Sequence, residues 1–245
     1  MTYTRKIGYI TQFLSVALVF AITSAAIGIL PYRKDDTKPV SAGNAPTAPI
    51  IVIDPGHGGE DGGASSDDGI HEKDLNLEVS DLISKLLKMS GADVRQSRTS
   101  DKMLYDLYGD MTDYSGKKKT FDLRNRIRFS DEANADLFVS IHMNKFFQKQ
   151  YSGLQVYYSP NDPSSKDYAE SVKSFVKSYL QPQNDRETKR ATSSIYILNH
   201  IQTPAILIEC GFLSNPEECA LLTTEEYQRS LAAVISLALM ESASK

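Results

Sequence analysis

The sequence predicts a single α/β domain built on a mixed, largely parallel sheet with helices on both faces. From Ile50 onward, apolar runs of strand length alternate with longer segments of helical periodicity. The apolar runs are continuous, as in strands that are buried on both faces of a parallel sheet. With 245 residues, of which 41% are hydrophobic, the chain is long enough for one domain with a substantial core.

Strong turn signals bound the first three elements. Four β-branched residues begin the strand 50–54, which Pro55 and the glycine after it terminate. Residues 72–89 place Leu, Val and Ile side chains at helical spacing, and this pattern predicts an amphipathic helix. Gly91 follows the helix, and a short strand is expected around 93–95.

The remaining elements continue the alternation. Each is either an apolar run of strand length or a longer segment of helical periodicity. They are a helix at 121–133, strands at 137–141 and 154–158, a helix at 164–180, a strand at 205–209 and a terminal helix from about 224 to 241. Strands separated by helices in this way predict parallel pairing, because a parallel pair needs a crossover connection.

The N-terminal part of the chain differs in composition from the rest. Residues 7–32 carry no charge and are rich in aliphatic side chains, and about 20 apolar residues suffice to span a bilayer as a helix. We expect residues 1–34 to be an export signal or a retained membrane anchor, because small residues at 24–26 suit cleavage but the apolar stretch is long for a signal peptide. Residues 35–49 contain prolines, a glycine and small polar residues, which predict a flexible linker. The domain at 50–245 is therefore expected outside the cytoplasm, and at the membrane if the segment is uncleaved.

Charge and cysteine content argue against a nucleic-acid-binding protein and against a protein built on a disulfide framework. The formal net charge is −4 and no basic stripe is present, so nucleic acid is not an expected partner. Cys210 and Cys219 form neither a disulfide framework nor a Cys-x-x-Cys motif. We expect two buried thiols, although a bridge across the eight intervening residues remains an alternative.

Two of the four histidines stand at the carboxyl ends of predicted strands. His57 lies in the glycine-rich run Asp-Pro-Gly-His-Gly-Gly at 54–59, and His142 ends the apolar run that begins at Leu137. The glycines leave room around His57 for a metal ion or an extended substrate. Ligands in open α/β sheets gather at the carboxyl ends of the strands, so these two histidines indicate a metal site.

Two glutamates complete the candidate site. Glu72 begins a predicted helix, where an acidic residue is also common without any function. Glu209 ends an apolar strand, and a carboxylate removed from water in this way is usually paired, metal-bound or catalytic. Two histidines, one carboxylate and an open position form the usual ligand set of catalytic zinc, and a second carboxylate can serve as general base. Spacing alone does not decide which glutamate has which role.

Four motifs in this order resemble those of the zinc-dependent N-acetylmuramoyl-L-alanine amidases. They are Asp-Pro-Gly-His-Gly-Gly at 54–59, Glu-Lys at 72–73, Ser-Ile-His-Met-Asn at 140–144 and Glu-Cys-Gly-Phe-Leu-Ser-Asn at 209–215. The resemblance covers roughly residues 50–242 and implies that 50–245 form a zinc amidase catalytic domain. It implies His57, Glu72 and His142 as zinc ligands and Glu209 as the catalytic acid and base. Within the family, the presence of the N-terminal segment and the lack of wall-binding repeats in this sequence resemble the short enzymes of the spore cortex.

The resemblance implies that the protein hydrolyses the amide bond between N-acetylmuramic acid and L-alanine in peptidoglycan. The alternatives are a zinc peptidase that acts within the stem peptide and an inactive wall-binding relative. Asn144, Arg190 and His200 are candidates for substrate contacts, the first because it shares a strand face with His142.

A long connection at 99–121 carries Tyr105, Tyr108 and Tyr114. Connections of more than about 12–15 residues are usually functional or disordered, and tyrosines suit glycan stacking or a protein interface. The connection after His142 is too short for an inhibitory helix over the zinc site. We therefore expect an activator protein, or the glycan strand, to contact the long connection; a mobile loop without a role is the alternative.

Overall fold

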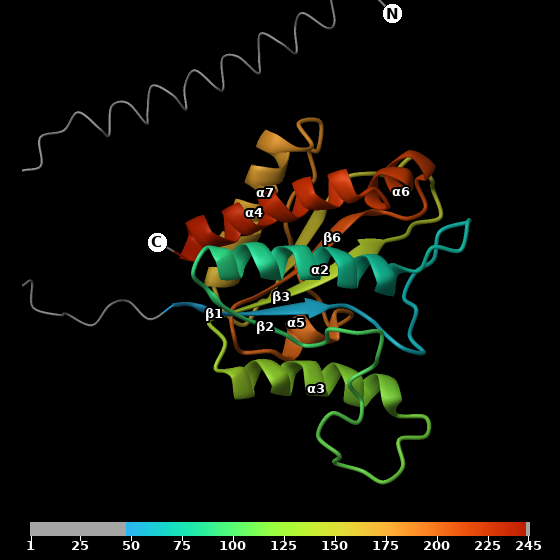
Figure 1. The fold of residues 1–245 in the computed structure, drawn as a ribbon, viewed down its shortest axis with the longest axis vertical. Helices are drawn as coiled ribbons and strands as arrows, with labels where there is room; N and C mark the ends of the chain where they lie inside the picture. The colour runs from blue at the N-terminus through green and yellow to red at the C-terminus, as the bar shows by residue number, and fades with distance from the viewer. Residues whose placement is uncertain (1–47, 244–245) are drawn as a thin grey trace, which may run out of the picture. The chain divides into compact units, whose positions relative to one another are not determined.

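The computed structural model describes residues 48–243, which form one α/β domain around a six-stranded sheet (Figure 1). The predicted export segment and nearly all of the predicted linker lie outside the described residues. Within residues 48–243, no helix has the length and apolar character needed to cross a membrane.

The sheet is mostly parallel, as predicted, and its strand order is β2-β1-β3-β6-β4-β5. Four strands run parallel: β1 (Ile50–Pro55), β2 (Asp93–Gln96), β3 (Leu137–Asn144) and β6 (Ala205–Phe212). The strand β4 (Gln155–Tyr158) is antiparallel to β6, and β5 (Lys189–Arg190) pairs with β4 in parallel at the edge.

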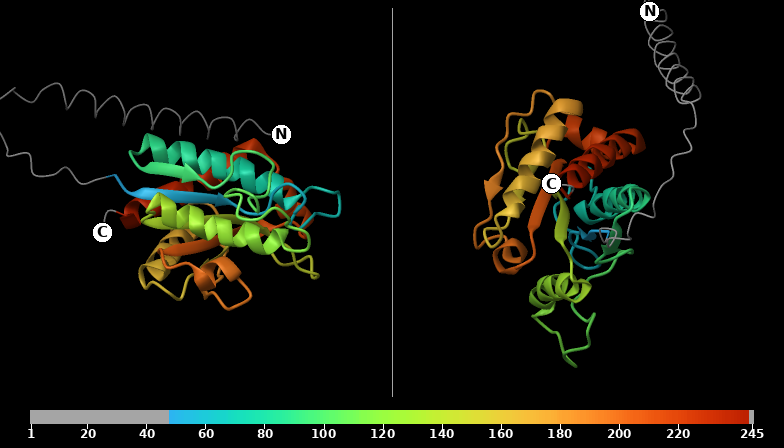
Figure 2. Two further views of the ribbon diagram at one scale, coloured as in Figure 1. Left: turned by 90° about the horizontal axis from the view of Figure 1, so that it is seen from below. Right: turned by 90° about the vertical axis from the view of Figure 1, so that its left-hand side faces the viewer.

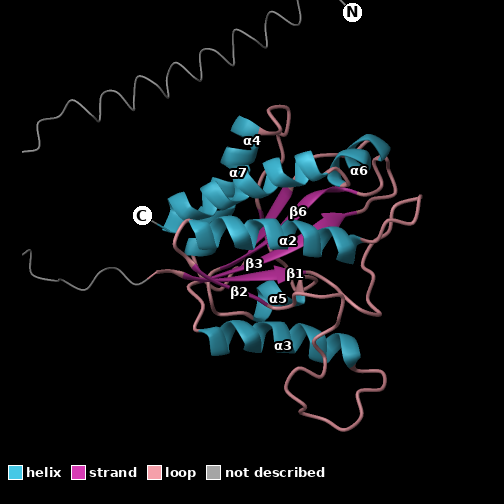
Figure 3. Ribbon diagram, viewed as in Figure 1, coloured by secondary structure: helices cyan, strands magenta, loops and turns pink. Residues whose placement is uncertain are grey.

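Helices cover both faces of the sheet (Figures 2 and 3). On one face, α2 (Glu72–Met89), α4 (Ser164–Tyr179), α6 (Pro216–Leu222) and α7 (Glu225–Ala243) contribute aliphatic side chains to the larger core. On the other face, α3 (Lys118–Ala133) and α5 (Tyr196–His200) pack over a smaller core.

The alternation of strand side chains places polar residues on this second face. Val52, Phe138 and Leu207 belong to the smaller core, so residues two or four positions further along each strand have the same orientation. His142 and Glu209 are two such residues, and they are direct partners in the pairing of β3 with β6. The sheet therefore presents both side chains side by side at its carboxyl edge.

The predicted elements are confirmed, and about half of their ends are shifted, by one to three residues. Three short elements were not predicted: β5, α5 and α6. Cys210 and Cys219 are buried free thiols, as expected.

The tyrosines of the long connection make ring contacts with one another and with α3. The rings of Tyr105 and Tyr114 lie 5.1 Å apart, and Tyr114 contacts Phe121 at 5.3 Å. Arg128 of α3 stacks on Tyr108, with 3.8 Å from its guanidinium carbon to the ring centre. The three tyrosines are half-buried because they pack on each other and on α3.

Candidate active site

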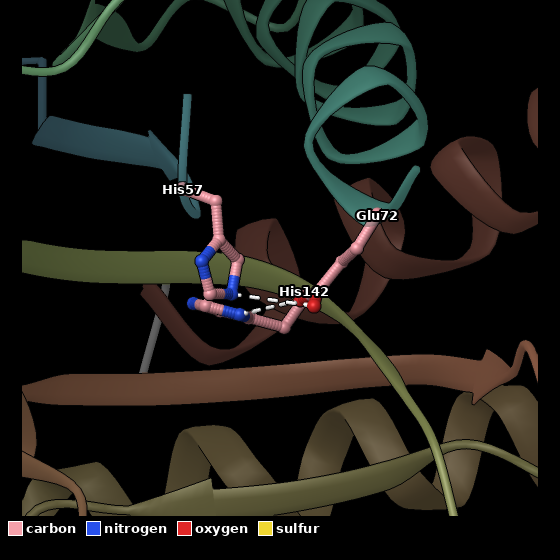
Figure 4. A group of neighbouring side chains, drawn as sticks. All are labelled: His57, Glu72 and His142. Carbon is pink, nitrogen blue, oxygen red and sulfur yellow. Dashed lines mark hydrogen bonds and ion pairs between the residues drawn. The ribbon is translucent and has the colours of Figure 1, made fainter. Parts of the chain in front are cut away.

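Three side chains from separate elements converge at the carboxyl edge of the sheet (Figure 4). His57 comes from the turn after β1, Glu72 is the first residue of α2, and His142 belongs to β3. His142 Nδ1 lies 2.8 Å from Glu72 Oε1, and His57 Nε2 lies 3.3 Å from Glu72 Oε2. One nitrogen or oxygen from each residue lies within 4.8 Å of the others, a spacing that a single metal ion can bridge.

The turn that carries His57 is strained and is held by neighbouring residues. His57 has a φ of 61°, a left-handed conformation that is costly for a residue with a Cβ. Its carbonyl accepts a hydrogen bond from Arg126 Nη2 at 2.7 Å, and its ring Nδ1 lies 2.9 Å from Asp61 Oδ2. These contacts leave Nε2 directed at Glu72. Burial lowers the pKa of His57, but the hydrogen bonds to Asp61 and Glu72 outweigh it and raise the pKa to about 9.

Glu72 is kept ionised although it is only 4% exposed. Its carboxylate accepts hydrogen bonds from the backbone N–H of Ala64 at 2.7 Å and of Met143 at 3.1 Å, and from Asn76 Nδ2 at 3.3 Å. Burial raises the pKa of Glu72, but hydrogen bonds to His142 and His57 dominate and hold the pKa well below its usual range. The position of this carboxylate is thus fixed from several sides.

Two glycines make the convergence of the three side chains sterically feasible. A Cβ on Gly56 would lie 2.3 Å from the ring of His142, so no other residue fits there without moving the imidazole. Gly63 has a φ of +68°, and a Cβ on it would lie 2.5 Å from Glu72 Oε2. Gly56 of the glycine-rich run therefore makes room for His142, and Gly63, which lies outside that run, makes room for Glu72.

Glu209 lies beside the three residues and differs from Glu72 in its electrostatics. Its Oε2 is buried and has no hydrogen-bond partner among the described residues. Burial raises the pKa of Glu209 to about 7, with a smaller contribution from the charge of Glu72, while the two histidines oppose the shift. A carboxyl group that changes protonation near neutral pH can both accept and donate a proton, as a general acid–base catalyst must.

A buried cluster of charged residues holds the turn that carries His57. Asp54 is fully buried and its Oδ1 accepts hydrogen bonds from Arg126 Nη1 at 2.6 Å and Ser97 Oγ at 2.5 Å, while Ser140 Oγ donates to Oδ2 at 2.7 Å. Burial raises the pKa of Asp54, but the Arg126 charge and the hydrogen bonds from these two hydroxyls lower it by a larger amount. The pKa of Asp54 is therefore below its usual value. Asp122 binds Arg126 Nε at 2.8 Å and completes the cluster.

The three candidate substrate residues lie in different places. Asn144 lines a cavity beside Glu209, and its side chain forms no hydrogen bond within residues 48–243. Arg190 is exposed on the edge strand β5, outside the lining of that cavity. His200 ends α5, where its ring stacks on Tyr196 at 4.0 Å and its Nδ1 lies 2.8 Å from the Tyr196 carbonyl oxygen. Only Asn144 is brought next to the candidate catalytic residues.

Three residues that position the site were not singled out from the sequence. Asp61 and Asn76 each stand four positions after a candidate ligand, His57 and Glu72, and helical spacing could have indicated Asn76. Arg126 is an ordinary charged residue in a helical pattern, so no sequence signal marked it as buried.

Comparison with known proteins agrees with this geometry. A family model described as N-acetylmuramoyl-L-alanine amidase matches residues 51–241. A germination-specific N-acetylmuramoyl-L-alanine amidase of Bacillus subtilis is 37% identical over 192 residues, which are 76% of this chain and 76% of the relative.

Solved structures show the same fold. The CwlD amidase of Clostridioides difficile, determined in complex with the GerS lipoprotein, is 37% identical, covers 80% of this chain and 98% of its own, and has a TM-score of 0.73. An N-acetylmuramoyl-L-alanine amidase of Clostridium difficile 630 is 29% identical, with coverages of 81% and 98% and a TM-score of 0.68. The chain therefore belongs to the N-acetylmuramoyl-L-alanine amidase family.

Proposed function

We propose that the protein is a zinc-dependent N-acetylmuramoyl-L-alanine amidase in which His57, Glu72 and His142 bind the metal and Glu209 transfers the proton. One observation carries the assignment of roles. Glu72 lies within 3.3 Å of both imidazoles and is held ionised, whereas Glu209 has a buried unpartnered oxygen and a pKa raised to about 7. The first set of properties suits a metal ligand and the second suits a general base.

The donor set fits zinc, which takes nitrogen ligands from histidine and oxygen ligands from carboxylates and keeps one position open in catalytic sites. When bound, zinc supplies Lewis-acid polarisation and lowers the pKa of water to about 7. Glu209 accepts a proton from the attacking water at its carboxylate. It then donates this proton to the departing amine nitrogen of L-alanine, which is otherwise a poor leaving group. Asp61 holds the tautomer of His57 by its contact with Nδ1.

Substitutions separate the two glutamate roles. His57→Ala or His142→Ala removes one of three protein ligands, so zinc content and activity should be lost together. Glu209→Gln should retain zinc and fold normally, yet lose activity by about 100- to 10,000-fold because an amide cannot shuttle the proton. Zinc content by plasma mass spectrometry and turnover of a soluble muramyl peptide measure both effects. Loss of zinc in Glu209→Gln, with retention in Glu72→Gln, would reverse the roles.

We propose that the enzyme acts on spore cortex. The supporting observation is the similarity to a germination-specific amidase and to a CwlD structure, each at 37% identity. Cortex from a strain that carries Glu209→Gln should retain more stem peptides per muramic acid than cortex from the parent. Equal numbers of stem peptides per muramic acid in the two cortices would contradict this assignment.

We also propose an extracytoplasmic location and an activator protein. Residues 1–34 direct export as a signal or anchor, and N-terminal sequencing of the mature protein distinguishes these two roles. The activator is supported by the CwlD amidase that was determined with a lipoprotein. Activity of the purified chain that equals its activity in sporulating-cell extract would show that no activator is required.

A further inference from the structure

A cavity of about 280 Å³ opens beside Glu209, on the side away from His57 and toward the sheet edge. Its position follows from the strand pairing. Gln155 of β4 is the direct partner of Glu209, and Tyr157 lies two residues further along the same face. Residues from four strands and from the segment before β5 line the cavity, among them Asn144, Gln155, Tyr157, Arg186, Lys189 and Phe212.

Arg186 presents an unused cationic group to this cavity. Its Nε donates a hydrogen bond to the Ser152 carbonyl at 2.8 Å, and its guanidinium carbon lies 4.7 Å from the centre of the Phe212 ring and 5.8 Å from that of Tyr151. Stacking on aromatic rings and one backbone hydrogen bond hold the planar group in place. Among residues 48–243, neither Nη1 nor Nη2 has a hydrogen-bond or ion-pair partner.

The acidic residues on either side of Arg186 are engaged elsewhere. Asp185 forms an ion pair with Lys177, and Glu187 forms one with Lys173 at 2.7 Å. Both lysines belong to α4, so neither acid neutralises Arg186. Lys189, another lining residue, lies 5.9 Å from the Tyr157 ring and has no ion-pair partner in the described part of the chain. Arg186 and Lys189 therefore bring two positive charges to the cavity. The Arg186 charge also acts on the carboxylate of Glu218, but that carboxylate accepts hydrogen bonds from the backbone N–H groups of Gly153 and Phe212.

We propose that this cavity, the Arg186 pocket, binds the free α-carboxylate of the second stem-peptide residue while the muramoyl amide lies at Glu209. The inference rests on the proposed function. A fixed guanidinium with two free amino groups suits bidentate binding of a carboxylate. One residue spans roughly 3.5 Å of extended chain, so the second residue of the stem peptide reaches a pocket directly beside the catalytic glutamate. Asn144 and Gln155 also line the pocket and can bind the peptide backbone. The Oε1 of Gln155 is buried and has no hydrogen-bond partner among the described residues.

Two synthetic substrates that differ in one group test the pocket with the full-length chain. They are N-acetylmuramoyl-L-alanyl-D-glutamate and its α-carboxamide analogue, N-acetylmuramoyl-L-alanyl-D-isoglutamine. The wild-type protein should favour the carboxylate by about tenfold or more in kcat/KM, because charge-assisted hydrogen bonds are about twice as strong as neutral ones. Arg186→Ala should abolish this preference, mainly through KM on the carboxylate substrate, and Arg186→Lys should restore part of it.

Arg95→Ala is the matched control, because Arg95 is an arginine on β2 at the opposite edge of the sheet. It should leave the preference unchanged. Two results overturn the pocket assignment. One is a similar fall in kcat/KM on both substrates in Arg186→Ala, and the other is an unchanged preference for the carboxylate substrate in that variant.

Failure of the proposed function would be visible separately. If the wild-type protein cleaves neither substrate, alone or in sporulating-cell extract, the amidase proposal fails. The pocket is then judged by calorimetric binding of the free peptide L-alanyl-γ-D-glutamyl-L-lysine. Weaker binding by Arg186→Ala than by the wild type and Arg95→Ala supports the pocket, and equal binding by all three overturns it.

Discussion

At the scale of single residues, the geometry of the site depends on a side chain that is not itself a candidate ligand. Asp61 accepts a hydrogen bond from His57 Nδ1 and forms an ion pair with Lys119 at the start of α3. Burial raises the pKa of Asp61, but these two cationic partners lower it well below its usual range. Asp61 thereby fixes the His57 ring with Nε2 toward Glu72, as carboxylate partners of metal-binding histidines commonly do.

Asp61→Asn tests this positioning role. The amide keeps the size of the side chain but loses the charge that stabilises the His57 tautomer, so zinc affinity should fall by about 10- to 100-fold. Competition with a chelating dye measures the affinity. Glu60→Gln is the matched control, because Glu60 is the adjacent acid and, among residues 48–243, forms an ion pair only with Lys118. Equal zinc affinities of Asp61→Asn and Glu60→Gln would contradict the role of Asp61.

At the scale of elements, α3 and β1 act together to hold the strained turn after β1. Arg126 of α3 is 1% exposed and reaches Asp54, the Pro55 carbonyl and the His57 carbonyl. Arg98 adds hydrogen bonds to the carbonyls of Pro55 and Gly56. Two buried guanidinium groups therefore hold the turn that carries His57.

Arg126→Met should destabilise the domain by about 3–5 kcal/mol, because it leaves Asp54 as a buried charge without its partner. In the wild type the folded state holds the pKa of Asp54 below its unfolded value of about 3.9, so this stabilisation is complete above that pH and is lost as the pH falls below it. The variant lacks this contribution, so the difference in unfolding free energy should shrink in acid. Urea titrations in the presence of EDTA at pH 7 and pH 3, above and below the unfolded pKa, measure it. A difference that is constant with pH would show that packing, and not the ion pair, is responsible.

The elements also show where sequence patterns suffice. The strands β1, β3 and β6 were predicted because their apolar runs are unbroken, and the helix α2 because its aliphatic residues keep helical spacing. The edge strand β5 consists of two charged residues and depends on pairing with β4, so no local pattern marks it. The helix α6 had a usable signal, since Asn215 accepts hydrogen bonds from two backbone N–H groups and Pro216 occupies the first turn.

At the scale of the whole molecule, the sheet brings together residues that are more than 150 positions apart in the sequence. His57 follows β1, and His142 and Glu209 lie toward the carboxyl ends of the adjacent parallel strands β3 and β6. Glu72 reaches them from the start of α2. The rule that ligands gather at the carboxyl ends of parallel strands predicted that His57 and His142 lie together, whereas the ligand role of Glu72 was an implication of the family resemblance. The supporting residues Asp61 and Arg126 could not be predicted equally well, because their roles depend on side-chain directions across tertiary contacts. The distinct electrostatics of Glu72 and Glu209 likewise arise from burial and neighbours that the sequence alone does not specify.

Mass spectrometry of purified peptidoglycan fragments after incubation with the full-length, zinc-loaded protein tests the central claim most directly. The expected products are an intact stem peptide that begins with L-alanine and a glycan whose muramic acid carries a free lactyl carboxylate. The Glu209→Gln protein should release neither product. Peptides cleaved within the stem, with L-alanine still attached to muramic acid, would show a peptidase and contradict the account.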